Sequence, residues 1–217
     1  MSEKRAVLFA NGQIASYSWA QSILIPDDFL IAADGGLGHC LNLGLTPSLL
    51  IGDLDSADPQ QVSTVQSLGC RVEKAPVEKD ETDLELALLW AARAGYSVIR
   101  ILGAIGGRID QELANLSLLL LPELTGRDVR ILTEEEECFL IRSQARLHGR
   151  AGDRVSLLPW GGAAEGISTT SLAYPLHFDR LAPERSRGIS NRMLEGTAEV
   201  SVAHGALLCI HSFTGEH

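Results

Sequence analysis

The sequence predicts an α/β fold: a mostly parallel β-sheet flanked by helices, followed by a smaller all-β sandwich domain. Three observations predict it. The first two thirds of the chain alternate short Val-, Ile- and Leu-rich runs with helical patterns, as in sheets covered on both faces. The last third has short strand-like segments separated by Gly, Pro and Asp turns, without a helical pattern. The composition is globular, because 45% of the 217 residues are hydrophobic and 21% are charged.

Apolar runs with little polar alternation predict the strands of the parallel sheet. The five clearest runs cover residues 6–10, 29–33, 49–51, 98–102 and 129–132. A weaker sixth candidate covers residues 71–75. Strands of this kind, alternating with helices, favour a parallel arrangement because each crossover connection returns the chain in the same direction.

Two helices are predicted between these strands. Residues 82–94 place apolar side chains at the spacing of one helical face. Thr82 with Glu85 forms a capping-box pattern, and Gly95 stands where a helix commonly ends. Residues 110–121 predict a second helix that is apolar nearly all round and ends at a proline, so we expect it to lie deep in the domain.

The pattern changes near Thr133. We interpret the four glutamates at 134–137 as an exposed turn between strands. Beyond them, short strands are predicted at residues 138–141, 155–158, 167–172, 199–203 and 207–213. The predicted domains are therefore an α/β domain over residues 1–143 and a smaller all-β domain over residues 144–217.

Charge and cysteine content exclude several classes of function. Eighteen Lys and Arg against 28 Asp and Glu give a net charge of −10, which disfavours nucleic acid and anionic membranes as partners. Any phosphate chemistry then requires a local device such as a divalent cation. The four cysteines are widely spaced and predict buried thiols rather than a zinc site or disulfides. With no signal-peptide pattern and no membrane-spanning run, we expect a cytoplasmic protein.

Aspartate and glycine gather at four places near the ends of the predicted elements. The four places are Asp34-Gly35-Gly36, residues 52–56 with Asp53 and Asp55, residues 80–83 ending in Asp83, and Gly106-Gly107-Arg108-Ile109-Asp110. Three of them directly follow a strand, and Asp83 opens a helix. Because parallel strands end at one edge of a sheet, several carboxylates should share one crevice. Carboxylate oxygens suit hard cations, so the pattern predicts a Mg²⁺ site.

The same residues have a plainer interpretation, because Asp and Gly dominate turns and helix caps. The coincidence of four such places on one edge favours a functional site. The glycines would let the backbone approach a phosphate and offer amide donors, and Arg108 is a candidate for a bidentate phosphate contact. Neither GxxxxGK[ST] nor GxGxxG after a strand occurs, so phosphate must be held by another device.

Five motifs in order along the chain resemble one family. They are ADGG at 33–36 with its preceding Ala32, IGDLDS at 51–56, KDETDLELAL at 79–88, GAIGGRIDQ at 103–111 and SRGISNRM at 186–193. Together they resemble thiamine pyrophosphokinases over nearly the whole chain. The resemblance implies a nucleotide-binding α/β domain, a thiamine-binding β-sandwich, and transfer of pyrophosphate from ATP to thiamine with Mg²⁺, giving thiamine diphosphate and AMP. It also implies a homodimer.

The resemblance carries site roles onto individual residues. It assigns catalytic acids at Asp53, Asp55, Asp83 and Asp110, of which the first three would hold the metal. Its implied nucleotide-binding residues are Asp34, Gly35, Gly36, Thr82, Gly106, Gly107, Arg108 and Gln111. Ser190 and Asn191 match the pair associated with thiamine.

Two alternatives and one mechanistic choice stay open. The hydroxyethyl oxygen of thiamine would lie in line with the β-phosphorus of ATP, with either Asp83 or Asp110 accepting its proton. A Mg²⁺-dependent phosphatase with Asp53 as nucleophile is a second hypothesis, although its motif follows the third strand. A nucleotide sensor without enzymatic activity is a third.

Overall fold

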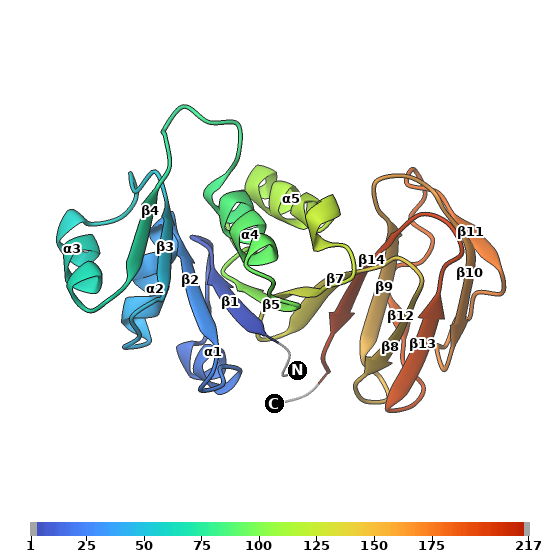
Figure 1. Cartoon of the computed structure of the whole chain (residues 1–217). Coiled ribbons are helices and arrows are strands. Elements are labelled where there is room, and N and C mark those ends of the chain that lie inside the picture. The colour runs from blue at the N-terminus through green and yellow to red at the C-terminus, as the bar shows by residue number, and fades with distance from the viewer. Residues whose placement is uncertain (1–3, 215–217) are drawn as a thin grey trace. The chain divides into compact units, whose positions relative to one another are not determined.

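The computed structural model describes residues 4–214, and the chain divides into two compact units between Glu134 and Glu135 (Figure 1). The sequence places the boundary later, at residues 143 and 144. Strand β7 (Glu136–Ile141) accounts for the difference, because it pairs along its whole length with β14 (Leu207–Ser212) of the second unit.

The first unit is built on a parallel sheet, in the spatial order β6, β5, β1, β2, β3, β4. Its strands are β1 (Arg5–Phe9), β2 (Phe29–Ala33), β3 (Leu49–Gly52), β4 (Arg71–Lys74), β5 (Val98–Leu102) and β6 (Asp128–Leu132). Each neighbouring pair is parallel. The six predicted runs are thus confirmed, and the strand order reverses next to β1, where α/β sheets open a crevice.

Helices cover both faces of this sheet. They are α1 (Tyr17–Ser22), α2 (Leu37–Asn42), α3 (Pro59–Ser67), α4 (Asp83–Arg93) and α5 (Ile109–Leu118), with short 3₁₀ turns at Asp34–Gly36 and Pro122–Leu124. Residues of α1, α2 and α3 share one core with Val7 and Phe9 of β1. Because side chains alternate along a strand, Ala6 and Leu8 face the other side, where α4 packs against β1, β2 and β3.

The ends of α4 confirm the helix prediction. The Thr82 hydroxyl accepts a hydrogen bond from the Glu85 amide at 3.2 Å, and Gly95 follows the helix with a φ of +84°. The prediction that the next helix lies deep is wrong. Asn115 is its buried residue, whereas Ile109 and Leu113 are 74% and 52% exposed. Although α5 carries apolar residues on several sides, only one of its faces packs against the domain.

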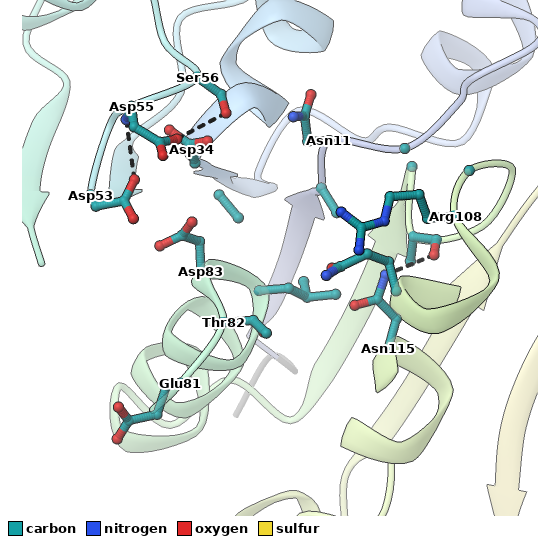
Figure 2. Close-up of a pocket in the computed structure, with 18 of the residues that line it drawn as sticks. Asn11, Asp34, Asp53, Asp55, Ser56, Glu81, Thr82, Asp83, Arg108 and Asn115 are labelled. Carbon is teal, nitrogen blue, oxygen red and sulfur yellow. Dashed lines mark hydrogen bonds between the residues drawn. The ribbon is translucent and has the colours of Figure 1, made fainter. Parts of the chain in front are cut away.

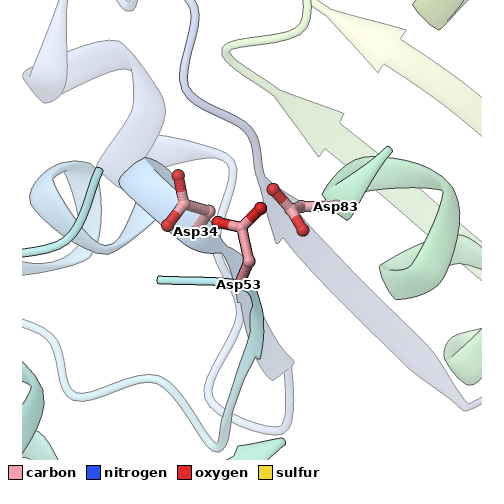
Figure 3. Close-up of side chains that lie close together, drawn as sticks. All are labelled: Asp34, Asp53 and Asp83. Carbon is pink, nitrogen blue, oxygen red and sulfur yellow. The ribbon is translucent and has the colours of Figure 1, made fainter. Parts of the chain in front are cut away.

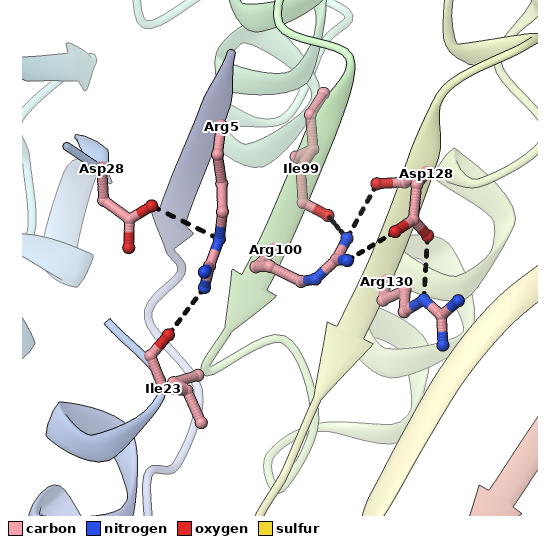
Figure 4. Close-up of polar contacts among 7 residues, drawn as sticks. All are labelled: Arg5, Ile23, Asp28, Ile99, Arg100, Asp128 and Arg130. Atoms are coloured by element: carbon pink, nitrogen blue, oxygen red, sulfur yellow. Dashed lines mark hydrogen bonds and ion pairs between the residues drawn. The ribbon is translucent and has the colours of Figure 1, made fainter. Parts of the chain in front are cut away.

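Arginines inside or beside the apolar strands are paired with nearby acceptors (Figure 4). Arg5 donates to the Ile23 carbonyl at 2.7 Å and lies 3.3 Å from Asp28. Arg100 of β5 and Arg130 of β6 both contact the Asp128 carboxylate. These pairs explain how a charged residue is accommodated within a strand that is largely buried.

The second unit consists of two sheets. Its strands are β7, β8 (Gln144–His148), β9 (Arg154–Pro159), β10 (Ala164–Thr170), β11 (Asp179–Leu181), β12 (Asn191–Arg192), β13 (Thr197–Ser201) and β14. They form the antiparallel orders β12-β9-β14-β7 and β11-β10-β13-β8. Leu157 and Leu207 of one sheet share a core with Leu147 and Val200 of the other. The predicted β-sandwich is confirmed.

Two further expectations meet the structure here. The interpretation of residues 134–137 as an exposed turn is wrong for its second half, because Glu136 and Glu137 belong to β7 and the Glu137 carboxylate contacts the buried His211 at 3.2 Å. The four cysteines are free and buried, as predicted. Within residues 4–214, the helices are all too short or too polar to cross a bilayer.

Candidate active site

A cavity of about 700 Å³ opens at the carboxyl edge of the parallel sheet, within the first unit. Its walls come from the segments that directly follow the strands: Asn11 after β1, Asp34 after β2, Asp53 after β3 and Gly103 after β5. The amino end of α4 closes one side with Thr82 and Asp83. Figure 2 shows four aspartates on one side of the cavity and Arg108 with Asn115 on the other; the aspartates are Asp34, Asp53, Asp55 and Asp83.

Three aspartates, which we call the acid group, meet in this cavity (Figure 3). Asp34, Asp53 and Asp83 each contribute a carboxylate oxygen, and these oxygens lie within 4.8 Å of one another. The three residues are far apart in the chain and come together because β2, β3 and α4 all end or begin at this edge. The predicted convergence of acids is therefore present in the structure.

The backbone beneath the acid group has an uncommon conformation. Asp34 and Leu54 have φ values of +44° and +64°, a region that side chains usually avoid. Gly52 has a φ of +150°, and a Cβ there would lie 3.0 Å from the Asp34 Cβ and the Asp83 carboxyl. Such strain is retained where the surrounding structure enforces it, commonly at functional sites.

The three carboxyls differ in their electrostatic surroundings. Burial raises the pKa of Asp34, with the nearby Asp83 and Asp55 charges acting in the same direction and the Ser56 hydroxyl opposing them. The pKa of Asp53 is lowered by a hydrogen bond from the Asp55 amide and by Lys79. The group therefore holds one carboxyl that resists ionisation next to one that favours it, an arrangement that an added cation would stabilise.

Lys79 is a site residue that the sequence analysis missed. Its Nζ lies 3.3 Å from Asp53 Oδ2 and 3.0 Å from Asp83 Oδ1, and its side chain is 10% exposed. The two acids outweigh burial and raise the pKa of Lys79, although burial alone would lower it. One signal was available, because Lys79 and Asp83 have the i, i+4 spacing of an ion pair.

The remaining predicted residues divide into those that line the cavity and those that do not. Lining it are Asp55, Thr82, Gly107, Arg108 and Gln111. Outside the lining are Gly35, Gly36, Gly106 and Asp110. Asp55 lies beside the acid group rather than in it: its amide donates to Asp53 at 3.1 Å, and its carboxylate accepts from the Ser56 hydroxyl at 3.0 Å.

Arg108 and Asp110 are engaged with each other. Two guanidinium nitrogens of Arg108 donate to the two carboxylate oxygens of Asp110, and both side chains are largely exposed. The Arg108 hydrogen bonds lower the pKa of Asp110. Asp110 is therefore a weaker proton acceptor than an unpaired aspartate would be.

The glycine loop before α5 also has an internal partner. The amides of Gly106 and Gly107, predicted as phosphate donors, both donate to Glu112 Oε1, at 2.9 and 2.7 Å. Glu112 lines the cavity, as do Asn11 and Asn115, and none of the three is among the predicted site residues. Asn115 donates to the Ala104 carbonyl at 2.8 Å and so holds this loop from below.

Ser190 and Asn191 lie in the second unit. The Asn191 side chain is buried and bonds to backbone groups, accepting from the amides of Tyr174 and Arg192 and donating to the Tyr174 carbonyl. Ser190 is exposed, has a φ of +57°, and donates its amide to Ser156. Their thiamine contacts stay a prediction.

The fold and the site together define a class of protein. It is an enzyme of two units, one α/β and one all-β, with an acidic cavity suited to a cation and phosphates. Residues 20–131 match the thiamin pyrophosphokinase catalytic domain, and residues 140–207 match the thiamin pyrophosphokinase vitamin B1 binding domain. The chain belongs to the thiamine pyrophosphokinase family, as its motifs predict.

Individual relatives agree with this assignment. The chain is 28% identical over 184 residues to thiamine pyrophosphokinase of Bacillus subtilis. This alignment covers 84% of this chain and 86% of that protein. A crystal structure of the Bacillus subtilis enzyme aligns with a TM-score of 0.87 at 25% identity, covering 98% of this chain and all of that one. The Candida albicans enzyme shares the fold, with a TM-score of 0.81 at 15% identity over 98% and 90% of the two chains. These relatives favour neither the phosphatase nor the sensor hypothesis.

Proposed function

We propose that this protein transfers pyrophosphate from ATP to the hydroxyethyl oxygen of thiamine, giving thiamine diphosphate and AMP. The observation that carries the proposal is the acid group, which lies in a cavity at the carboxyl edge of the sheet in a chain of this family. The first unit would bind ATP, and the second would bind thiamine through the region of Ser190 and Asn191.

A divalent cation, with Mg²⁺ as the expected ion, fits the acid group. Asp34 Oδ1 and Asp83 Oδ1 are buried and have no hydrogen-bond partner, although Lys79 forms an ion pair with the second. Buried carboxylate oxygens without donors are costly, and hard cations prefer oxygen ligands. Asp34, Asp53 and Asp83 would hold the ion, with Asp34 in the place that the sequence analysis gave to Asp55.

The chain's own residues would then perform positioning and charge neutralisation. When bound, the cation would neutralise part of the charge on the polyphosphate that is transferred. The Asp55 amide fixes the orientation of the Asp53 carboxylate. Arg108 lines the cavity and would exchange Asp110 for a phosphate, since its planar fork suits either partner. Of the two candidate acceptors for the hydroxyl proton, Asp83 lines the cavity and Asp110 does not, so Asp83 is the one that a substrate in the cavity would reach.

Product analysis tests the proposed function. The purified protein is incubated with ATP, Mg²⁺ and thiamine, and the products are separated chromatographically. AMP and thiamine diphosphate in equal amounts are expected. Release of inorganic phosphate without AMP would instead indicate the phosphatase, and ATP binding without any product would indicate a sensor.

The Gly52→Ala variant tests whether the acid group must keep its geometry. The new Cβ would press on Asp34 and Asp83, so we expect kcat/KM to fall about ten-fold or more through displacement of the carboxylates. Gly38→Ala is the matched control, because a Cβ at Gly38 meets nothing within 4 Å. Equal activity in the two variants would show that the close approach at Gly52 is unimportant.

Two further properties belong to the proposal. We propose a cytoplasmic location, which four buried free thiols support because disulfides are rare in that reducing compartment.

We also propose that the protein is a homodimer, on the basis of the family resemblance. Sedimentation of the purified protein across a range of concentrations measures its mass and would reveal a monomer directly.

A further inference from the structure

Lys79 occupies the position where a cation would bridge two members of the acid group. Its Nζ lies about equally far from Asp53 and Asp83, and nine tenths of its side chain is buried against the cavity wall. Without this ammonium, three neighbouring carboxylates would face one another across less than 5 Å. The lysine therefore supplies the positive charge that the acid group needs when nothing else is bound.

A divalent ion bridging the same two carboxylates would come too close to this ammonium. Metal ligand distances of about 2.0–2.6 Å would place the ion next to Nζ, which lies 3.0 and 3.3 Å from the same side chains. Two cations at such short range repel strongly. The lysine and the ion would thus compete for Asp53 and Asp83.

Lys79 lies on an irregular segment beside the cavity, where another partner for its ammonium could enter. It lies in the connection between β4 and α4, residues 75–82, which has no regular secondary structure and appears as the long loop in Figure 1. Val77 in the same connection is 70% exposed, so the segment is not anchored by a core side chain there. Val77, Lys79 and Thr82 line the cavity in which the polyphosphate would lie.

We propose that Lys79 is an exchangeable counter-ion: it neutralises the acid group in the free protein and moves onto the polyphosphate when the metal–nucleotide complex enters. This inference rests on the proposed function and extends it to one residue. It follows that the free protein binds a divalent cation weakly on its own, and that the cation enters together with the nucleotide. A lysine with a purely structural role would instead support both kinds of binding.

The Lys79→Met variant separates these roles by giving two effects of opposite sign. Titration calorimetry with Mn²⁺ alone should show about ten-fold tighter binding than in the wild type, because the competing ammonium is gone. Titration with the Mg²⁺ complex of α,β-methylene-ATP, whose α–β linkage cannot be cleaved, should show about ten-fold weaker binding. Neither measurement needs thiamine or turnover, so both stay decisive if the proposed reaction is absent.

Two controls accompany the variant. Lys4→Met removes the same charge before the amino end of β1, away from the cavity, and should leave both affinities unchanged. Lys79→Arg keeps the charge and should restore the wild-type order of affinities. Unchanged or weaker Mn²⁺ binding in Lys79→Met would overturn the competition, and unchanged binding of the nucleotide analogue would overturn the move onto the polyphosphate.

Discussion

The Asp83→Asn variant is expected to lose about 100-fold or more in kcat/KM while remaining folded, by analogy with other lost electrostatic stabilisers. Asp83 is the first residue of α4, and its carboxylate both belongs to the acid group and pairs with Lys79. An amide at this position keeps the shape but removes the charge that a cation and Lys79 require. Steady-state formation of AMP from ATP and thiamine measures the loss.

Glu81→Gln is the matched control for Asp83→Asn. Glu81 lines the same cavity, but it is exposed and lies outside the acid group, pointing away from it in Figure 2. The same change of charge should therefore cost less than about three-fold, as for exposed groups that make no close pair. A similar loss in both variants would mean that the general negative charge of the cavity, rather than the acid group, supports the reaction.

Much of the first unit was predictable, because most of its strands are short apolar runs between turns. The acids at their carboxyl ends could be placed on one edge without knowing any side-chain contact. Helices α1 and α2 have six residues each, too few to show a helical stripe, and α3 buries mainly Val65. Strands β11 and β12 have three and two residues, below the length at which alternation is visible.

The site itself was less predictable, because contacts across the chain decide which neighbours share an interaction. Asp34 and Asp55 both lie near the cavity, but only the backbone turn at Asp34 aims a carboxylate into the acid group. Lys79 pairs with Asp53 across 26 positions, a separation that carries no sequence signal. The hydrogen bonds from the glycine loop to Glu112 depend on the direction in which α5 leaves that loop, and no sequence pattern indicates this direction.

The second unit contains a buried polar cluster that no sequence pattern indicated. His211 is fully buried, with Nδ1 3.2 Å from Glu137 and Nε2 3.4 Å from Asp153. The Asp153 carboxylate is 2% exposed and accepts hydrogen bonds from the amides of Arg150 and Thr214 and from the Thr214 hydroxyl. This cluster ties the turn before β9 to the end of β14, at one end of the sandwich.

Replacing Asp153 with asparagine should therefore destabilise the protein by about 2–3 kcal/mol, because the amide nitrogen that replaces Oδ2 cannot accept the Arg150 hydrogen bond, and the negative charge beside His211 is lost. Burial alone would raise the pKa of Asp153, but the bonds from Thr214 and Arg150 outweigh it and hold the pKa below its usual value. A carboxyl with a lowered folded pKa stabilises the fold above its unfolded pKa of about 3.9, and loses that contribution as pH falls through the folded value.

Urea unfolding at neutral pH should show the full difference in stability between the Asp153→Asn variant and the wild type, and this difference should shrink below about pH 4. The exposed Glu195→Gln variant serves as the control and should unfold like the wild type. An Asp153→Asn midpoint equal to that of the control at neutral pH would refute a stabilising role for the buried carboxylate.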